Sequence, residues 1–186
     1  MDAFTPSQVI RQKKKNFLSR KSWITLAASL LGTLITTLIL FGVIFGPAVI
    51  EGDSMNLSLK NADFVLYWRL GTYGAGDVVM LKMKEEETRA EKDYVKRIVG
   101  TPGDTVTIDD YGNVLINGVT QPEKYAVGNT QKLGGVTYPL ILQSDEYFVL
   151  GDNRQDSRDS RTYGAVKKGQ IKGKVVTLLR YDKDEI

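Results

Sequence analysis

Two side chains that together could carry out a hydrolysis, Ser54 and Lys96, occur in a chain of 186 residues with no histidine and no cysteine. A serine hydroxyl is a poor nucleophile at neutral pH unless a base takes its proton. Because histidine is missing, a lysine is the best available base for Ser54. The absence of cysteine also excludes thiolate catalysis, thiolate metal ligands and disulfides.

The β-strand predicted around Lys96 places this lysine on one face with Tyr94 and Ile98, and places Arg97 on the other face. Two interpretations follow: a lysine solvated at a strand edge, or a buried lysine kept neutral. Lowering the pKa from about 10.4 to 7 corresponds to roughly 4.6 kcal/mol. Burial can supply this shift, with Tyr94, Ile98 and Met55 as candidate apolar neighbours. Arg97→Ala should then retain much more activity than Lys96→Ala.

An uncharged apolar run, residues 23–50, precedes the serine and predicts a transmembrane helix, since roughly 20 residues span the hydrocarbon core. A cleavable signal peptide would have a shorter apolar region, of about 7–15 residues. Residues 1–22 carry six basic residues and one acidic residue. Because lysine and arginine prefer the cytoplasmic side and can contact anionic lipid, we expect 1–22 to be cytoplasmic. The expected protein is a single-pass protein of the cell membrane, with residues 51–186 as an extracytoplasmic domain.

After residue 50 the sequence changes to short alternating apolar runs separated by Gly, Asn and Asp, which is typical of strands. Residues 105–118 predict a hairpin with positive φ at Gly112 and Asn113, and Asn117-Gly118 predicts a second tight turn. The expected fold class is mostly β, an antiparallel β domain on one N-terminal transmembrane helix. The predicted strands are 64–68, 78–83, 94–99, 105–108, 114–116, 147–150 and 174–179.

Several other functions are excluded by composition and spacing. The formal net charge of +3 is too small to indicate a nucleic-acid-binding protein. The glycines of residues 71–76 have the wrong offsets for a dinucleotide-binding motif. Asp152, Asp156 and Asp159 do not form a calcium loop, because Arg154 stands where such a loop needs a ligand. We therefore expect no metal, no organic cofactor and no nucleic-acid partner.

Four segments, in this order, resemble the motifs of the type I signal peptidases, membrane-bound Ser/Lys endopeptidases that remove signal peptides from exported proteins. The resemblance covers the apolar run and essentially all of the chain after it. The last segment is the longest match and the most specific. The four segments are Gly52-Asp53-Ser54-Met55, residues 76–79 (Gly-Asp-Val-Val), residues 94–104 (beginning Tyr-Val-Lys-Arg) and residues 151–164 (beginning Gly-Asp-Asn-Arg).

The resemblance implies that Ser54 is the nucleophile and Lys96 the general base. It also implies that Ser157 hydrogen-bonds Lys96 and orients its amine. A hydroxyl suits this position, because a carboxylate beside the lysine would raise its pKa. Asp159 and Arg161 would form an ion pair that holds the loop. The substrates would be signal peptides of exported precursors, with small residues at the first and third positions before the cleaved bond, as in Ala-x-Ala.

We expect the substrate to bind as an added strand against Val95 and the segment before the nucleophile, with Met55 and Tyr94 beside it. Leu57 stands where the family usually has proline. Without proline the loop loses a fixed φ, which costs roughly 0.4–1 kcal/mol and is too little to abolish catalysis. Gly52 stands where some relatives have a serine that helps to stabilise the oxyanion. Backbone N–H groups, that of the nucleophile and that of Gly52, would then take this role.

Two other classes of function share parts of this pattern. One is a catalytically idle relative that binds or chaperones exported subunits, for instance in pilus assembly. The presence of both Ser54 and Lys96 argues against it, since an idle protein has no chemical need for the pair. The other is a self-cleaving Ser/Lys protein of the repressor type. The membrane segment and the lack of a DNA-binding segment argue against this alternative.

Overall fold

The computed structural model describes residues 20–84 and 89–180. The chain divides into two units, Met1–Gly42 and Val43–Ile186. Most of the predicted basic segment, residues 1–22, lies outside the described residues.

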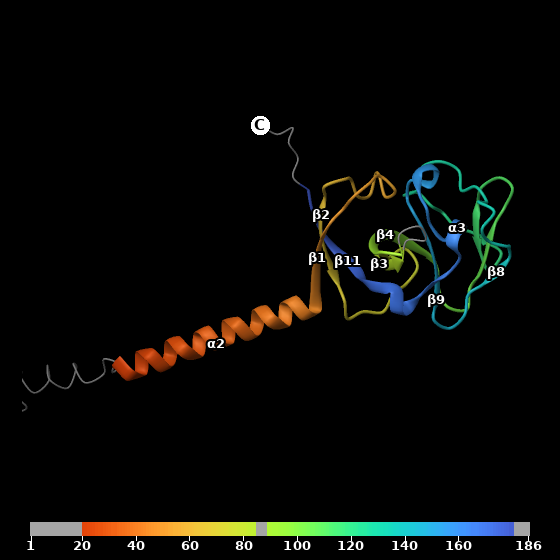
Figure 1. Cartoon of the computed structure of the whole chain (residues 1–186). Coiled ribbons are helices and arrows are strands. Elements are labelled where there is room, and N and C mark those ends of the chain that lie inside the picture. Colours follow the sequence, from red (N-terminus) through yellow and green to blue (C-terminus); the bar gives the residue numbers. More distant parts are fainter. Residues whose placement is uncertain (1–19, 85–88, 181–186) are drawn as a thin grey trace, which may run out of the picture. The chain divides into compact units, whose positions relative to one another are not determined.

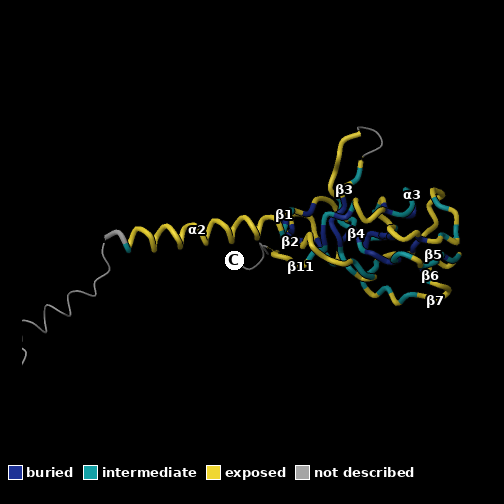
Figure 2. Tube along the Cα trace, turned by 90° about the horizontal axis from the view of Figure 1, so that it is seen from below, coloured by how far each residue is buried: buried dark blue, intermediate teal, exposed yellow. Residues whose placement is uncertain are grey.

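The first unit contains nearly all of helix α2 (Arg20–Ile44), drawn in Figure 1 as one continuous helix. Its stretch Ser22–Ile44 has a mean hydropathy of 2.2 and is the one helix among the described residues that is long and apolar enough to cross a membrane. Twenty-three residues at about 1.5 Å per residue exceed the roughly 30 Å of a hydrocarbon core. The side chains of α2 are exposed almost throughout (Figure 2).

The helix does not extend through the whole predicted apolar run. It ends at Ile44, and β1 (Phe45–Val49) follows at once. Pro47 has no backbone N–H to continue a helix, and proline disfavours helical geometry at the preceding residue, Gly46. The expected helix end at residue 50 is therefore corrected to Ile44.

The second unit is built from two antiparallel sheets. The seven-stranded sheet has the order β1-β2-β11-β3-β4-β9-β10, and the four-stranded sheet has the order β7-β6-β5-β8. The strands of the larger sheet after β1 are β2 (Phe64–Trp68), β3 (Val78–Lys84), β4 (Glu91–Gly100), β9 (Glu146–Leu150), β10 (Val166–Lys167) and β11 (Ile171–Leu179). The smaller sheet contains β5 (Thr105–Ile108), β6 (Val114–Ile116), β7 (Val119–Thr120) and β8 (Leu140–Ile141). Three short helices follow β9: η2 (Arg154–Asp156), α3 (Ser160–Tyr163) and η3 (Lys168–Gln170).

This architecture confirms the expected class, mostly antiparallel β with one apolar N-terminal helix. All seven predicted strands are present. The predicted hairpin of β5 and β6 is formed, and Gly112 in its turn has φ 83°. Asn113 does not have the expected positive φ; its N–H and side-chain amide donate instead to the carboxylate of Asp109. Asn117 and Gly118 have φ 52° and 78°, as predicted for the next tight turn.

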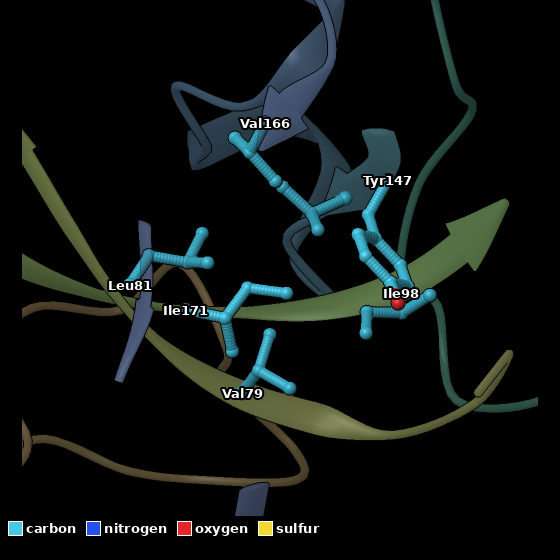
Figure 3. Close-up of a cluster of buried hydrophobic side chains, with 7 residues drawn as sticks. Val79, Leu81, Ile98, Tyr147, Val166 and Ile171 are labelled. Carbon is cyan, nitrogen blue, oxygen red and sulfur yellow. The ribbon is translucent and has the colours of Figure 1, made fainter. Parts of the chain in front are cut away.

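Three clusters of buried apolar side chains form the core. Figure 3 shows the first, where side chains from β3, β4, β9, β10 and β11 converge. Along β3, Val79 and Leu81 belong to this cluster, while Met80 points to a cluster on the opposite face that also contains Met55. The third cluster joins Phe148 and Leu150 of β9 to the smaller sheet. Buried clusters therefore cover both faces of the sheet where β3 pairs with β4, the strand that carries Lys96.

Candidate active site

Ser54 and Lys96 meet directly. The Nζ atom of Lys96 lies 2.6 Å from Oγ of Ser54, although 42 residues separate them in the chain. Lys96 comes from β4, and Ser54 lies in the turn region that follows β1. This is hydrogen-bond distance, so a neutral Lys96 can accept the proton of the hydroxyl.

Lys96 is buried, with 2% of its surface exposed. Burial lowers its pKa to about 8, because the charged ammonium loses its hydration there. Asp159 and Asp152 oppose this effect at longer range, and Arg161 reinforces it. Among the described residues, no carboxylate forms an ion pair with the Lys96 amine that would restore its charge. Of the two interpretations, the structure agrees with a buried lysine and not with a lysine solvated at a strand edge.

The core clusters agree with the predicted faces for three residues of the lysine strand. Tyr94 and Ile98 pack in the cluster of Figure 3, on the face to which strand alternation assigns Lys96, while Val95 packs in the opposite cluster. Met55 belongs to that opposite cluster and is 1% exposed. Its buried side chain anchors the residue directly after Ser54 in the core.

The segment before Ser54 is fixed by the loop that follows Ser54. The N–H of Gly52 donates to Oδ1 of Asn61 at 3.0 Å, and Gly52 has φ 86°. The Gly52 N–H is thus already engaged with Asn61, and a contribution of the Gly52 main chain to oxyanion binding stays a prediction. The positive φ also disfavours a serine at this position. The N–H of Ser54 donates to none of the described residues and remains available.

Asp159 and Arg161 form the predicted ion pair. Nε and Nη2 of Arg161 each lie 2.8 Å from a different carboxylate oxygen of Asp159, and both side chains are almost completely buried. Asp159 also caps α3 and accepts the N–H of Gly151 at 3.0 Å. Arg161 donates to the carbonyl of Ser157 at 3.3 Å, so the pair supports the loop that carries Ser157.

Ser157 differs from what the resemblance implies. Its Oγ is buried and has no hydrogen-bond partner in the part of the chain that the structure describes, so the expected bond to Lys96 is not formed. The Ser157 side chain lies instead against the backbone of Gly151, where a Cβ atom would collide with it. The same missing Cβ would come within 2.6 Å of the Ser54 carbonyl oxygen. Only glycine at position 151 therefore allows both Ser54 and Ser157 to pack against this part of the backbone.

Several residues of this site were not identified from the sequence. Arg97 forms an ion pair with the fully buried Asp152, and Asp152 also accepts a hydrogen bond from Ser58, in the nucleophile loop. Asn153 donates to the carbonyls of Asp53 and Ser54. In the sequence, only the position of Asp152 and Asn153 within the last motif indicated a role for them. No motif contains Ser58.

A groove of about 670 Å³ passes the Ser54 hydroxyl. Its lining includes residues 47–55 and residues 92–96, among them the predicted substrate-binding residues Met55, Tyr94 and Val95. β4 pairs with β9 only from Arg97 onward, so no described strand pairs with the groove edge of residues 91–96. β1 pairs only with β2 among the described strands. No group of three or more acidic side chains in the described residues is arranged to hold a metal ion.

The chain is similar to signal peptidases. A family model described as "Signal peptidase, peptidase S26" matches residues 21–179. Signal peptidase I P of Bacillus subtilis subsp. natto is 34% identical over 173 residues, which cover 87% of this chain and 90% of the relative. Signal peptidase I S of Bacillus subtilis (strain 168) is 33% identical over 174 residues, covering 87% and 91%. A crystal structure of a signal peptidase I from Enterococcus faecalis is 30% identical, with a TM-score of 0.46, and covers 57% of this chain and 98% of that one.

Proposed function

Because the chain belongs to the signal peptidase family, peptidase S26, whose members are serine endopeptidases that cleave signal peptides, we propose that Ser54 is its nucleophile and Lys96 its general base. The observation that carries this assignment is the 2.6 Å distance between Lys96 Nζ and Ser54 Oγ. The lowered pKa of Lys96, about 8, supports it, because an appreciable fraction of the amine is then neutral near neutral pH.

In the acylation step, the lone pair of neutral Lys96 takes the hydroxyl proton while Oγ of Ser54 bonds to the carbonyl carbon of the scissile peptide. The carbonyl electron pair moves onto its oxygen and forms the tetrahedral oxyanion. The N–H of Ser54, which donates to none of the described residues, is a candidate donor to this oxyanion. One donor of this kind is typically worth about 10²–10³ in rate.

Collapse of the tetrahedral intermediate breaks the C–N bond and leaves an ester on Ser54. The Lys96 ammonium returns its proton to the leaving amine and becomes neutral again. In the second half of the reaction, Lys96 takes a proton from a water molecule as the water oxygen attacks the ester. The C–Oγ bond then breaks, and the Lys96 ammonium gives its proton to Oγ, which restores the Ser54 hydroxyl and the neutral amine. The carboxylic acid product loses its own proton to water, so the cycle needs no metal and no cofactor.

The substrate binds as an added strand along the groove, paired with the backbone of residues 92–96. The unpaired groove edge of these residues supports this mode, since its backbone N–H and C=O groups need partners. Met55, Met80 and Val95 line the groove and favour apolar side chains near the cleaved bond. The preferred substrates have small residues at the first and third positions before the cleaved bond, as in Ala-x-Ala.

The protein is anchored in the cell membrane by α2, with residues 1–22 in the cytoplasm and the β domain outside. The apolar stretch Ser22–Ile44 and the excess of basic residues before it support this orientation. Protease added to intact spheroplasts should digest the β domain and spare an epitope at Met1. Protection of the β domain would place Ser54 on the wrong side of the membrane.

Cleavage of an Ala-x-Ala precursor by the detergent-solubilised full chain tests the catalytic pair. Ser54→Ala and Lys96→Ala should each abolish cleavage, and the double variant should be no worse, because nucleophile and base act as a unit. Ser144→Ala and Lys82→Ala, at exposed positions, are the matched controls and should keep wild-type rates. A folded single variant with near wild-type activity would exclude the assignment. Binding without cleavage by the wild type would favour the idle, chaperone-like alternative.

A further inference from the structure

Asn153 makes two hydrogen bonds to the backbone of the nucleophile turn. Its N–H donates to the Ser54 carbonyl at 3.0 Å, and its side-chain Nδ2 donates to the Asp53 carbonyl at 3.2 Å. Asn153 is also the N-cap residue of η2, but its side chain makes no capping hydrogen bond there. Its amide is therefore directed to the nucleophile turn and not to its own helix.

The residue before Asn153 fixes the other end of the same loop. Asp152 has no exposed surface and accepts a hydrogen bond from the hydroxyl of Ser58, four residues after the nucleophile. It also accepts two hydrogen bonds from Arg97, at 2.8 and 2.6 Å. Because Arg97 directly follows Lys96, the base strand and the nucleophile loop are held by the same carboxylate.

The backbone around Asn153 is itself held from behind by residues 121–130. The N–H of Val127 donates to the Asp152 carbonyl at 2.8 Å, and its carbonyl accepts the N–H of Arg154 at 3.0 Å. Arg154, 2% exposed, makes a two-bond ion pair with Glu123 at 2.6 and 2.7 Å. The residues on either side of Asn153 are thus both held in place. The Asn153 side-chain amide can therefore fix the position of the Asp53-Ser54 turn.

We propose that Asn153 is a positioning residue, whose side-chain amide holds the Asp53-Ser54 turn so that Oγ of Ser54 stays within reach of Lys96. The inference rests on the proposed function of Ser54. The mechanism requires a fixed Oγ, because a displacement of about 1 Å from the attack geometry can cost about 10²-fold in rate. Without the amide, Asn153 keeps only its backbone bond to Ser54, and the Asp53 carbonyl is no longer held by the Asn153 side chain.

The test compares Asn153→Ala and Asn153→Asp in the full chain with a precursor substrate. Asp has the same shape as Asn and is at least as good an N-cap, but a carboxylate cannot donate to the Asp53 carbonyl. We expect both variants to lower kcat by about 10- to 100-fold, with KM within about twofold of wild type. The acid limb of the kcat profile in Asn153→Ala should stay near the pKa of Lys96, about 8, since no charge is changed.

Asn129→Asp, an exposed asparagine of the 121–130 segment, is the matched control and should keep the wild-type kcat. Asn153→Asp with wild-type turnover would overturn the proposal, since the donor would not matter. Loss of folded protein in both variants would also overturn it, because Asn153 would then hold the fold and not the nucleophile. Ser54→Ala, assayed in parallel, separates the two proposals: activity in that variant contradicts the catalytic pair, whereas an inactive Ser54→Ala beside a fully active Asn153→Ala contradicts only the positioning role.

Discussion

Arg97 and Asp152 form an ion pair with two hydrogen bonds, and the side chain of Asp152 has no exposed surface. The Arg97 guanidinium also lies 4.2 Å from the centre of the Tyr125 ring. From the strand pattern, Arg97 was expected to face away from Lys96, and Arg97→Ala was expected to retain much more activity than Lys96→Ala. It does face away, but it supports the site through Asp152.

Arg97→Ala should lower the free energy of unfolding by about 3–5 kcal/mol, because it leaves the buried Asp152 charge without a partner. Chemical denaturation measures this loss. Adding Asp152→Asn to Arg97→Ala should recover part of it, since the unpaired charge is removed. Per folded molecule, Arg97→Ala should still cleave faster than Lys96→Ala. An unchanged unfolding midpoint in Arg97→Ala would show that the ion pair contributes no stability.

Turnover should rise with pH through about 8 and level off above it. Burial lowers the pKa of Lys96, and below that pKa the amine is protonated and has no lone pair with which to accept the Ser54 proton. A pH–rate profile of kcat on a precursor measures the position of the acid limb. An acid limb near the ordinary lysine value of about 10.4 would mean that Lys96 is solvated during catalysis.

Lys96→Met should be inactive yet more stable than wild type at pH 7, by roughly 1–3 kcal/mol, because methionine is apolar and has a similar length. Between about pH 8 and the higher pKa of an unfolded chain, the unfolded state binds more protons than the folded state. Wild-type stability therefore rises with pH across this window, and the advantage of Lys96→Met should shrink. Urea unfolding at pH 7 and pH 10 tests this; an equal difference at both values would contradict the lowered pKa.

Ser157→Ala should lower kcat more than it changes KM, while making the protein slightly more stable. The buried Oγ of Ser157 has no partner among the described residues, and a buried unpaired hydroxyl costs about 1–3 kcal/mol. A buried polar group without a partner in a native protein is often retained at a functional position, and Ser157 packs against Gly151, which also lies close to the Ser54 carbonyl. Thermal unfolding and steady-state kinetics measure the two effects. Full turnover together with raised stability would leave Ser157 without a catalytic role.

Leu57→Gly should raise stability by about 1 kcal/mol, because Leu57 has φ 86°, a conformation that only glycine adopts without strain. Leu57→Pro should destabilise by more than 1 kcal/mol, since proline fixes φ near −65° and removes the N–H that donates to Asn56. Leu70→Gly, at an exposed leucine without positive φ, is the control and should destabilise. Thermal unfolding of the three variants gives the order. Greater stability of Leu57→Pro would contradict the backbone conformation of this loop.

The positive φ of Leu57 also changes the meaning of the missing proline at this position. The sequence suggested that Leu57 only removes a restraint that proline would supply. In the structure, the backbone at Leu57 has a sign of φ that proline cannot adopt. A missing proline can therefore mark a different loop conformation, and a motif alignment compares residue types without reporting φ.

The properties that depend on local pattern followed from the sequence alone. Strand positions follow from alternation, the turn at Asn117-Gly118 from residues that tolerate positive φ, and α2 from an uncharged run. The placement of Lys96 on a strand face with Ile98 also needed only the two-residue period. The Asp159–Arg161 pair is only two residues apart, and the motif predicted it.

The tertiary structure alone decided which distant groups meet. The Lys96–Ser54 contact spans 42 residues, and the bond from Asn153 to Asp53 spans 100. Periodicity says which face a side chain takes but not which loop packs against it. Pro47 disfavours a helix locally, but the pairing of β1 with β2, which an apolar run does not predict, was visible only in the tertiary structure. Loop packing in the folded domain, and not local preference, therefore buried Lys96, paired Arg97 with Asp152 and brought Ser54 into contact with Lys96.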